Sequence, residues 1–126
     1  MVDVICDTSF LIHIANNRIK NISSLETEIG SIQFVVPDIV ISELTRLGSL
    51  QQKRQEVNAT LQYIKSLKTI KLGGSYADES FVSYVKKTGG VVATMDKDLK
   101  SAIKKAGGSI ISVSHNKIVL ESRSNL

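Results

Sequence analysis

Residues 91–113, VVATMDKDLKSAIKKAGGSIISV, contain a complete strand–helix–strand unit. Residues 91–94 form a short apolar run that is typical of a buried strand, and residues 109–113 form another. Between them, residues 97–106 have the apolar spacing of a helix, and the glycine pair 107–108 is a typical helix end. The apolar positions of this helix are Leu99, Ile103 and Ala106. A helix between two apolar strands favours a parallel pair of strands.

The same alternation of strand and helix periods extends through the rest of the chain. The expected strands are residues 2–6, 32–36, 68–72, 91–94 and 109–113. The first expected helix begins at Thr8 and Ser9, which can cap it. The other expected helices span residues 22–29, about 38–47, 51–67, about 78–88 and 97–106. The tail from Ser114 is ambiguous, and a short strand at 117–120 is one interpretation of it. We therefore expect a single α/β domain, residues 1–126, with a parallel sheet covered by helices on both faces.

Composition narrows the class of protein. A chain of 126 residues with 42% apolar and 5% aromatic side chains can form a core, which must be largely aliphatic. Short, interrupted apolar runs argue against a membrane span, and acids near the N-terminus argue against a secretory signal. The single Cys6 excludes an intramolecular disulfide, and two histidines are too few for a plausible zinc site. We expect a reduced, cytoplasmic protein with no membrane partner.

The net charge of +4 is unevenly distributed. Residues 1–63 carry five basic and seven acidic side chains, whereas residues 64–126 carry eleven and five. A basic surface on one side of a protein favours a polyanion such as a nucleic acid, although a solvated helix face is also lysine-rich.

Four acidic residues lie at informative positions in the expected elements. Asp7 ends the first strand, Glu43 lies inside the helix after the second, Asp78 opens the helix after the third, and Asp96 follows the fourth. Groups at the carboxyl ends of parallel strands meet where the strand order reverses. Asp7 and Asp96 would therefore be neighbours if the first and fourth strands are adjacent.

A carboxylate cluster without histidine suits hydrolysis of phosphodiesters assisted by Mg²⁺ or Mn²⁺, because these hard cations prefer carboxylate and water oxygens. Two structural interpretations stay open beside it. Asp7, Asp78 and Asp96 all stand near helix starts, where a carboxylate caps backbone N–H groups. Glu43, in the middle of a helix, could lie on a solvated face.

Other chemistry-bearing residues favour structural roles. His13 falls on a largely apolar helix and is expected to be partly buried, and Cys6 is expected to be a small core residue. The glycine pairs at 73–74 and 89–90 lack the lysine and hydroxyl residue of a phosphate-binding loop.

Three stretches together resemble the PIN-domain nuclease family. They are VICDTSFLIHIA at 4–15, VVPDIVISELTRL at 35–47 and ADESFVSYVKKTGGVVATMDKDLKSAIKKAGGSII at 77–111. The order and spacing of the motifs extend from residue 4 to about residue 113. The resemblance implies a three-layer sandwich whose central, parallel, five-stranded sheet has the order 3-2-1-4-5.

The resemblance also implies an active site. The family typically cleaves single-stranded or structured RNA with Mg²⁺ or Mn²⁺, so the chain is expected to be a metal-dependent endoribonuclease. Ser9 and Thr94 match supporting hydroxyl positions, and Asp98 matches an additional acid whose role varies. The expected catalytic and metal-holding residues are Asp7, Glu43, Asp78 and Asp96. The lysines expected to hold RNA phosphates are Lys86, Lys87, Lys97 and Lys100.

Three interpretations remain within the family. The second motif, TMDKDL at 94–99 and the ending GGSIISV resemble archaeal single-domain relatives of the rRNA-processing nuclease of the small-subunit processome, which favours a role in rRNA or other RNA processing. VapC-type toxins share the length and the acids. A non-catalytic module that binds RNA or protein would keep the fold without the activity. Members are often dimers, so a homodimer is also an expectation.

Overall fold

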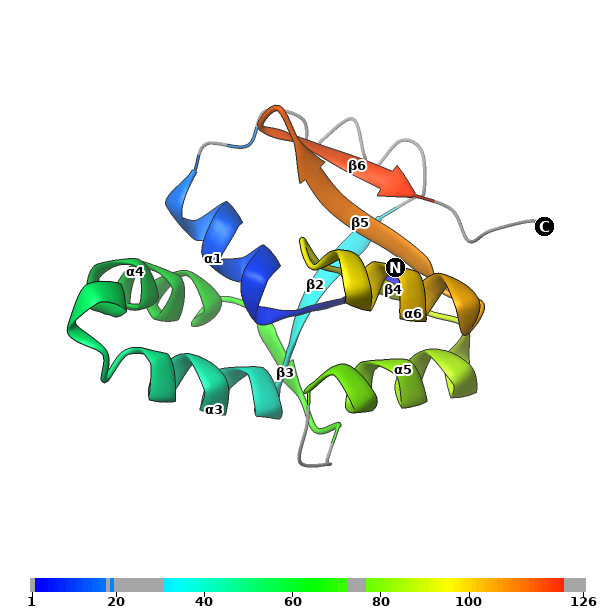
Figure 1. Cartoon of the computed structure of the whole chain (residues 1–126), viewed down its shortest axis with the longest axis horizontal. Coiled ribbons are helices and arrows are strands. Elements are labelled where there is room, and N and C mark those ends of the chain that lie inside the picture. Colours follow the sequence, from blue (N-terminus) through cyan, green and yellow to red (C-terminus); the bar gives the residue numbers. More distant parts are fainter. Residues whose placement is uncertain (1, 18, 20–30, 73–76, 122–126) are drawn as a thin grey trace.

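A six-stranded sheet forms the middle of the molecule (Figure 1). The structure is a computed structural model that describes residues 2–17, 19, 31–72 and 77–121. The strands are β1 (Val2–Cys6), β2 (Ile32–Pro37), β3 (Lys68–Ile70), β4 (Val91–Ala93), β5 (Ser109–Ser114) and β6 (Lys117–Glu121). Their order in the sheet is β3-β2-β1-β4-β5-β6. The predicted order of the first five strands is confirmed.

The sheet has one strand more than the sequence predicted. β1 to β5 are parallel, whereas β6 runs antiparallel to β5. The turn between β5 and β6 holds His115 and Asn116 at φ values of 54° and 62°. Positive φ at both turn residues matches the right-handed twist of a hairpin. The strand at 117–120 that the sequence left open is therefore present, and it extends to Glu121.

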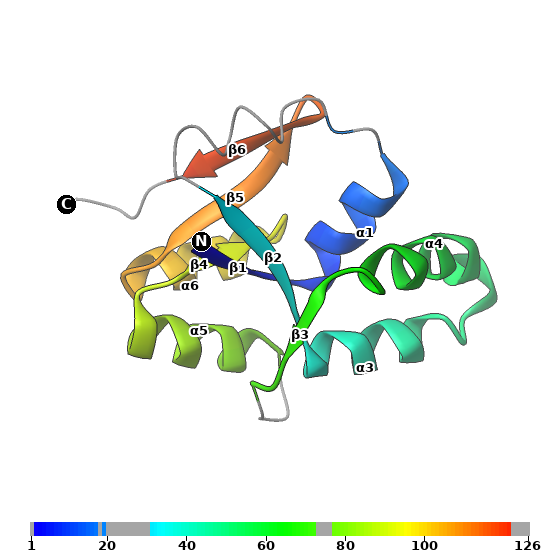
Figure 2. The same cartoon turned by 180° about the vertical axis from the view of Figure 1, so that it is seen from behind.

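Helices cover the sheet in two groups. They are α1 (Thr8–Asn16), α3 (Asp38–Leu47), α4 (Arg54–Ile64), α5 (Ala77–Thr88) and α6 (Lys97–Lys105), with a short 3-10 turn η1 (Gln51–Lys53) before α4. α4 packs against α1 and α3, and α5 packs against α6. Figures 1 and 2, taken from opposite sides, show these groups at opposite ends of the view. Right-handed crossovers place α1, α3 and α4 on one face and α5 and α6 on the other.

One helix is shorter than the sequence predicted. The helix expected over residues 51–67 begins as the 3-10 turn and ends at Ile64, so it is shorter. The helix expected over residues 22–29 lies outside the described residues. No helix in the described part of the chain is long and apolar enough to cross a membrane.

The core is mainly aliphatic, as the composition predicted. Phe10 and Phe81 are its largest fully buried side chains, and the Phe10 ring meets Phe34 edge-on at a centroid distance of 5.5 Å. Cys6 is fully buried in β1, and burial raises the pKa of its thiol well above the usual value. Cys6 is thus a core residue, as expected.

The sheet reverses its order at β1. β1 pairs with β2 on one side and with β4 on the other, so the chain leaves the carboxyl ends of β1 and β4 toward opposite faces. The backbone N–H of Asp7 donates to Ala93 O at 3.0 Å, which ties these two strand ends together. This is the position where an open α/β sheet forms a crevice.

Candidate functional site

Asp7 is the centre of a hydrogen-bond network at the end of β1. Its carboxylate accepts from the backbone N–H of Phe10 at 2.9 Å and so caps α1. The Ser9 hydroxyl donates to the same carboxylate, at 2.9 and 3.1 Å from its two oxygens. The Thr94 hydroxyl donates to Oδ2. Asp7 itself, rather than Thr8 or Ser9, is therefore the cap of this helix.

The hydroxyls of Ser9 and Thr94 join the two strand ends. Ser9 Oγ accepts from the backbone N–H of Met95 at 3.1 Å, and Thr94 Oγ1 accepts from the backbone N–H of Asp96 at 3.0 Å. Each hydroxyl therefore donates to Asp7 and accepts from the segment after β4. The supporting roles that the resemblance implied for Ser9 and Thr94 stay a prediction.

Asp7 is 7% exposed, and its burial has an electrostatic cost. Burial raises the pKa of its carboxyl from 3.8 to about 6, against the lowering effect of the hydrogen bonds from Thr94, Phe10 and Ser9. The negative charge of Asp96 raises this pKa further. An uncharged asparagine could cap the helix without this cost, so capping alone does not explain an aspartate here.

Asp96 is also a helix cap. Its Oδ1 accepts from the backbone N–H groups of Asp98 at 2.8 Å and Leu99 at 3.2 Å, at the start of α6. The capping interpretation is thus correct for Asp7 and Asp96 as a local statement. Both caps nevertheless lie close enough for their charges to interact.

Asp78 also interacts with the negative charge of Asp96. It is an exposed residue in the first turn of α5. Partial burial raises the pKa of its carboxyl, and the charges of Asp96 and Asp98 raise it further. The charge of Asp96 thus acts on both Asp7 and Asp78, and the charge of Asp98 acts on Asp78. None of these acids forms an ion pair with a lysine, arginine or histidine of the described segments.

Glu43 is the least connected of the predicted acids. It lies half-buried in the middle of α3, and its carboxylate makes no hydrogen bond or ion pair with a described residue. Asp38, at the start of the same helix, accepts instead from the backbone N–H groups of Ile39 at 2.9 Å and Leu72 at 3.2 Å. Asp38 is therefore a structural acid of the first turn of α3.

The acids do not form a closed ligand set. Within residues 2–17, 19, 31–72 and 77–121, no three His, Cys, Asp or Glu side chains are arranged to hold a metal ion. The donor types nevertheless fit Mg²⁺ or Mn²⁺, because hard oxygen ligands and uncompensated negative charge are what these cations require. A cation held here would keep several waters.

The four predicted lysines differ in their surroundings. Lys86, Lys87 and Lys97 are exposed and make no ion pair with a described acid. Lys100 is more buried, and its Nζ lies 3.3 Å from Glu121 Oε2. Of the four, Lys100 is therefore the least available for a phosphate.

Some features of the structure have no signal in the sequence pattern. Thr8 Oγ1 and His13 Nε2 are buried and have no hydrogen-bond partner among the described atoms. His13 is half-buried, as its apolar helix predicted. A hollow along α5 also includes Val82 and Ser83, which carry no motif signal of their own.

The sequence was compared with models of known protein families and with known proteins. A family model described as a PIN-like domain matches residues 4–116. No curated protein sequence gives a significant match.

Solved structures share the fold. The structure of the PIN domain endonuclease Utp24 is 30% identical in sequence, with a TM-score of 0.73 over 95% of this chain and 91% of that one. A domain of a functionally unknown protein from Methanocaldococcus jannaschii DSM 2661 is 16% identical, with a TM-score of 0.56 over 100% of this chain and 98% of that one. PAE2754 from Pyrobaculum aerophilum is 19% identical, with a TM-score of 0.51 over 89% of this chain and 84% of that one.

Proposed function

Because the chain belongs to the PIN-like domain family, we propose that it is a Mg²⁺- or Mn²⁺-dependent endoribonuclease that processes rRNA or another RNA. The observation that carries the proposal is the buried Asp7 at the carboxyl end of β1, whose charge interacts with that of Asp96 after the adjacent strand β4. Asp78, at the start of α5, also interacts with Asp96. Burial raises the pKa values of Asp7 and Asp78, the charge of Asp96 raises both further, and no described basic side chain forms an ion pair with either acid. A bound cation and a phosphodiester would use such a site.

The proposed ligands are Asp7, Glu43, Asp78 and Asp96, with Asp98 as a less central acid. A bound Mg²⁺ or Mn²⁺ would polarise the phosphoryl oxygen and lower the pKa of a water. Ser9 and Thr94 hold the Asp7 carboxylate in one orientation through their hydroxyls. Hydrolysis adds water across the P–O3′ bond and leaves a 5′-phosphate and a 3′-hydroxyl, with no covalent enzyme intermediate.

The substrate side of the proposal depends on charge. Lys86, Lys87 and Lys97 are exposed on α5 and α6, the elements that carry Asp78 and follow Asp96. Cations on both sides of the site would hold phosphates of an RNA chain, with an affinity that falls as salt rises. We place this activity in the cytoplasm, which fits the single free Cys6. The homodimer stays a prediction that analytical ultracentrifugation would check.

The deciding experiment is cleavage of labelled rRNA precursor and of a second structured RNA in the presence of Mn²⁺. Asp7→Asn and Asp96→Asn are expected to reduce the cleavage rate at least about a hundredfold, because each removes a charged ligand. Glu56→Gln is the matched control, since Glu56 is an exposed acid on α4, away from the strand ends. Equal cleavage by the parent and both aspartate variants would overturn the proposal.

A non-catalytic module that binds RNA or protein is the second candidate, because the described acids form no closed ligand set. Thermal unfolding with Mn²⁺ separates the two functions. A ligand that binds only the folded state raises the melting temperature. The endoribonuclease predicts such a rise in the parent and its loss in Asp96→Asn, whereas no rise at millimolar Mn²⁺ would favour the binding module.

A further inference from the structure

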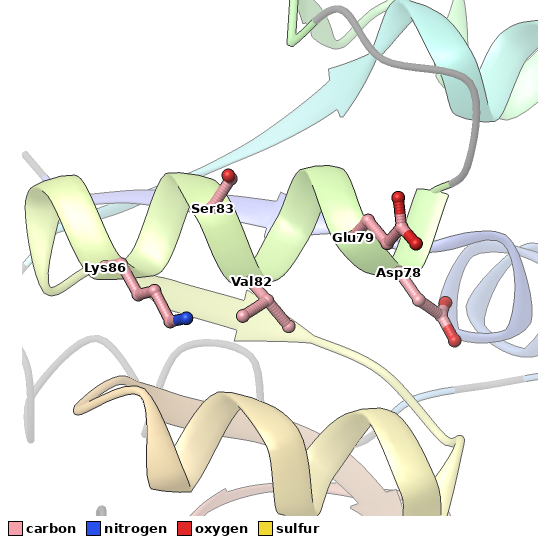
Figure 3. A pocket seen from close by; sticks show the side chains of 5 residues that line it. All are labelled: Asp78, Glu79, Val82, Ser83 and Lys86. Carbon is pink, nitrogen blue, oxygen red and sulfur yellow. The ribbon is translucent and has the colours of Figure 1, made fainter.

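A hollow of about 350 Å³ runs along α5 and is lined by Asp78, Glu79, Val82, Ser83 and Lys86. Figure 3 shows these five side chains. One end of the hollow contains Asp78, a proposed metal ligand, and the other end contains Lys86. The hollow therefore connects the site at the strand ends with a cation farther along the same helix.

The spacing along α5 fixes how far apart these two groups are. Asp78, Val82 and Lys86 follow one another at intervals of four residues, and Figure 3 shows them on the side of α5 that faces α6. At about 1.5 Å of rise per residue, the Cα atoms of Asp78 and Lys86 are separated by about 12 Å along the helix axis. No ion pair between described residues joins them. A phosphate held by Lys86 is thus a different phosphate from one bound beside Asp78.

The electrostatic state of Lys86 differs from that of Lys100 and Lys104 on α6. Lys104 and Lys100 are both committed to Glu121, at 3.0 and 3.3 Å. Lys86 is exposed and has no acid partner in the described part of the chain, so its ammonium remains available to an external anion. Asp78 and Glu79 make the opposite end of the hollow negative, which directs the anion to the Lys86 end.

Val82 supplies the surface between the two ends. It is a half-buried apolar side chain that packs against the core and still lines the hollow. An apolar patch between two charged ends suits the sugar or the face of a base more than a second phosphate. Such a face is accessible in a single strand, whereas stacking and pairing hide it inside an A-form duplex.

We propose that the α5 hollow is a subsite for single-stranded RNA, in which Lys86 binds a phosphate other than the one cleaved and Val82 contacts the intervening nucleoside. This subsite rests on the proposed function, because RNA is its ligand. The RNA chain would then lie along α5 between the cleavage site and Lys86. Lys86 is a positioning residue here, since it touches the substrate away from the reacting phosphate.

The test measures RNA binding in EDTA, so that metal and cleavage do not enter. Fluorescence anisotropy follows a labelled, unstructured oligoribonucleotide of about ten residues, a length within the range of single-strand sites. Lys86→Ala is expected to weaken binding several-fold and to reduce the slope of log K against log salt by about 0.7, the value for one phosphate contact in a single strand. Val82→Ala is expected to weaken binding without changing this slope, because it removes no charge.

Lys53→Ala is the control, and Lys87→Ala, at another proposed phosphate-binding lysine, tests whether the effect is specific to the hollow. Lys53→Ala removes the same charge from η1, between α3 and α4, and is expected to change binding little. Lys87→Ala removes the next lysine of α5, which does not line the hollow, and is expected to have a smaller effect than Lys86→Ala. Thermal unfolding confirms that each variant is folded.

The inference is overturned if Lys86→Ala and Lys53→Ala behave alike, if a duplex of the same sequence binds as well as the single strand, or if the parent binds no RNA. Its failure is distinct from failure of the nuclease proposal. Normal cleavage that Asp7→Asn abolishes, with no effect of Lys86→Ala on binding, would reject the subsite alone. A specific Lys86 effect on binding, with no cleavage under any metal condition, would reject the nuclease alone.

Discussion

At the scale of single residues, Asp7 shows a conflict between stability and proposed function. As a cap it accepts from the backbone N–H of Phe10, and as a buried carboxylate it is held by two hydroxyls. These hydrogen bonds lower its pKa, yet burial outweighs them and the pKa rises to about 6. The folded protein therefore carries an unfavourable charge at neutral pH. A residue that only caps the helix does not need this charge, and such a cost to stability is expected at functional sites.

The first prediction concerns the pH dependence of this cost in the Asp7→Asn variant. Because the pKa of Asp7 rises from its ordinary 3.8 to about 6 on folding, the folded state binds the proton more tightly, and unfolding becomes easier as pH increases through this window. Asparagine keeps the capping oxygen without the charge. We expect the variant to exceed the parent in free energy of unfolding by about 3 kcal/mol at pH 7, with no advantage from charge near pH 4.

Urea unfolding in EDTA at several pH values measures this difference. Glu56→Gln is the control, since Glu56 is exposed and its substitution is expected to give a difference from the parent that varies little over the same range. If the advantage of Asp7→Asn were the same at pH 4 and pH 7, the carboxylate would not be the destabilised group.

At the scale of elements, one acid of β6 connects this strand to α6 and adds to its ladder with β5. Glu121 on β6 accepts from Lys104 Nζ at 3.0 Å and from the Ser112 hydroxyl at 2.9 Å. Lys100 Nζ lies 3.3 Å from Glu121 Oε2, the oxygen that also accepts from Ser112. The contact with Lys104 is the main cause that lowers the pKa of Glu121 from 4.5 to about 2.

The second prediction is that Glu121→Gln destabilises the fold at neutral pH. A lowered pKa means that the carboxylate stabilises the folded state above pH 4.5, and that this contribution disappears as pH falls toward 2. Since the pair is partly exposed, we expect a loss of about 1 kcal/mol at pH 7. Unfolding at pH 7 and pH 3 measures it, and a loss that did not shrink at pH 3 would contradict the pairing.

The third prediction concerns the close packing where α6 turns into β5. A Cβ on Gly108 would lie 2.6 Å from Val85 Cγ1, 2.9 Å from Ile103 Cγ2 and 3.0 Å from Gly90 O. We expect Gly108→Ala to destabilise the protein by about 2 kcal/mol, since overpacking a full core forces its neighbours apart. Gly48→Ala is the matched control, because its nearest contact is Val57 Cγ1 at 3.2 Å. Thermal unfolding should therefore rank Gly108→Ala well below Gly48→Ala.

The elements themselves were largely predictable, because each is encoded by a local period. β1, β2, β4 and β5 follow from apolar runs, and α6 follows from Leu99, Ile103 and the glycines after it. The early end of the helix after η1 was not, since Lys65 and Leu67 continue the helical pattern while the chain already turns toward β3. β6 was ambiguous because an edge strand of five residues has a weak alternating signal.

At the scale of the whole molecule, the crossover rule brings Asp7 and Asp96 together. Strand order and handedness are general properties of α/β folds, so the adjacency of β1 and β4 could be expected once the family was recognised. The distances among side chains depend on rotamers and hydrogen bonds that no spacing rule encodes. That is why the sequence suggested four acids together, whereas in the structure the Glu43 carboxylate makes no described polar contact and the Asp7 carboxylate accepts from Phe10, Ser9 and Thr94.

The last prediction is that the distribution of charge, rather than its total, governs RNA binding. The double variant Lys86→Glu with Lys87→Glu changes the net charge from +4 to zero, and so does Lys53→Glu with Lys65→Glu. The first pair lies on α5 beside the proposed site, whereas Lys53 and Lys65 flank α4 on the other helical layer. Because phosphate contacts act at short range in salt, we expect the α5 pair to lose RNA affinity at least about tenfold more than the α4 pair.

Filter binding at near-physiological salt measures the affinities. The rise in melting temperature with Mn²⁺ should persist in both variants, since neither removes a proposed metal ligand. Equal losses of affinity in the two variants would mean that RNA responds only to net charge, and the orientation of RNA along α5 would be wrong.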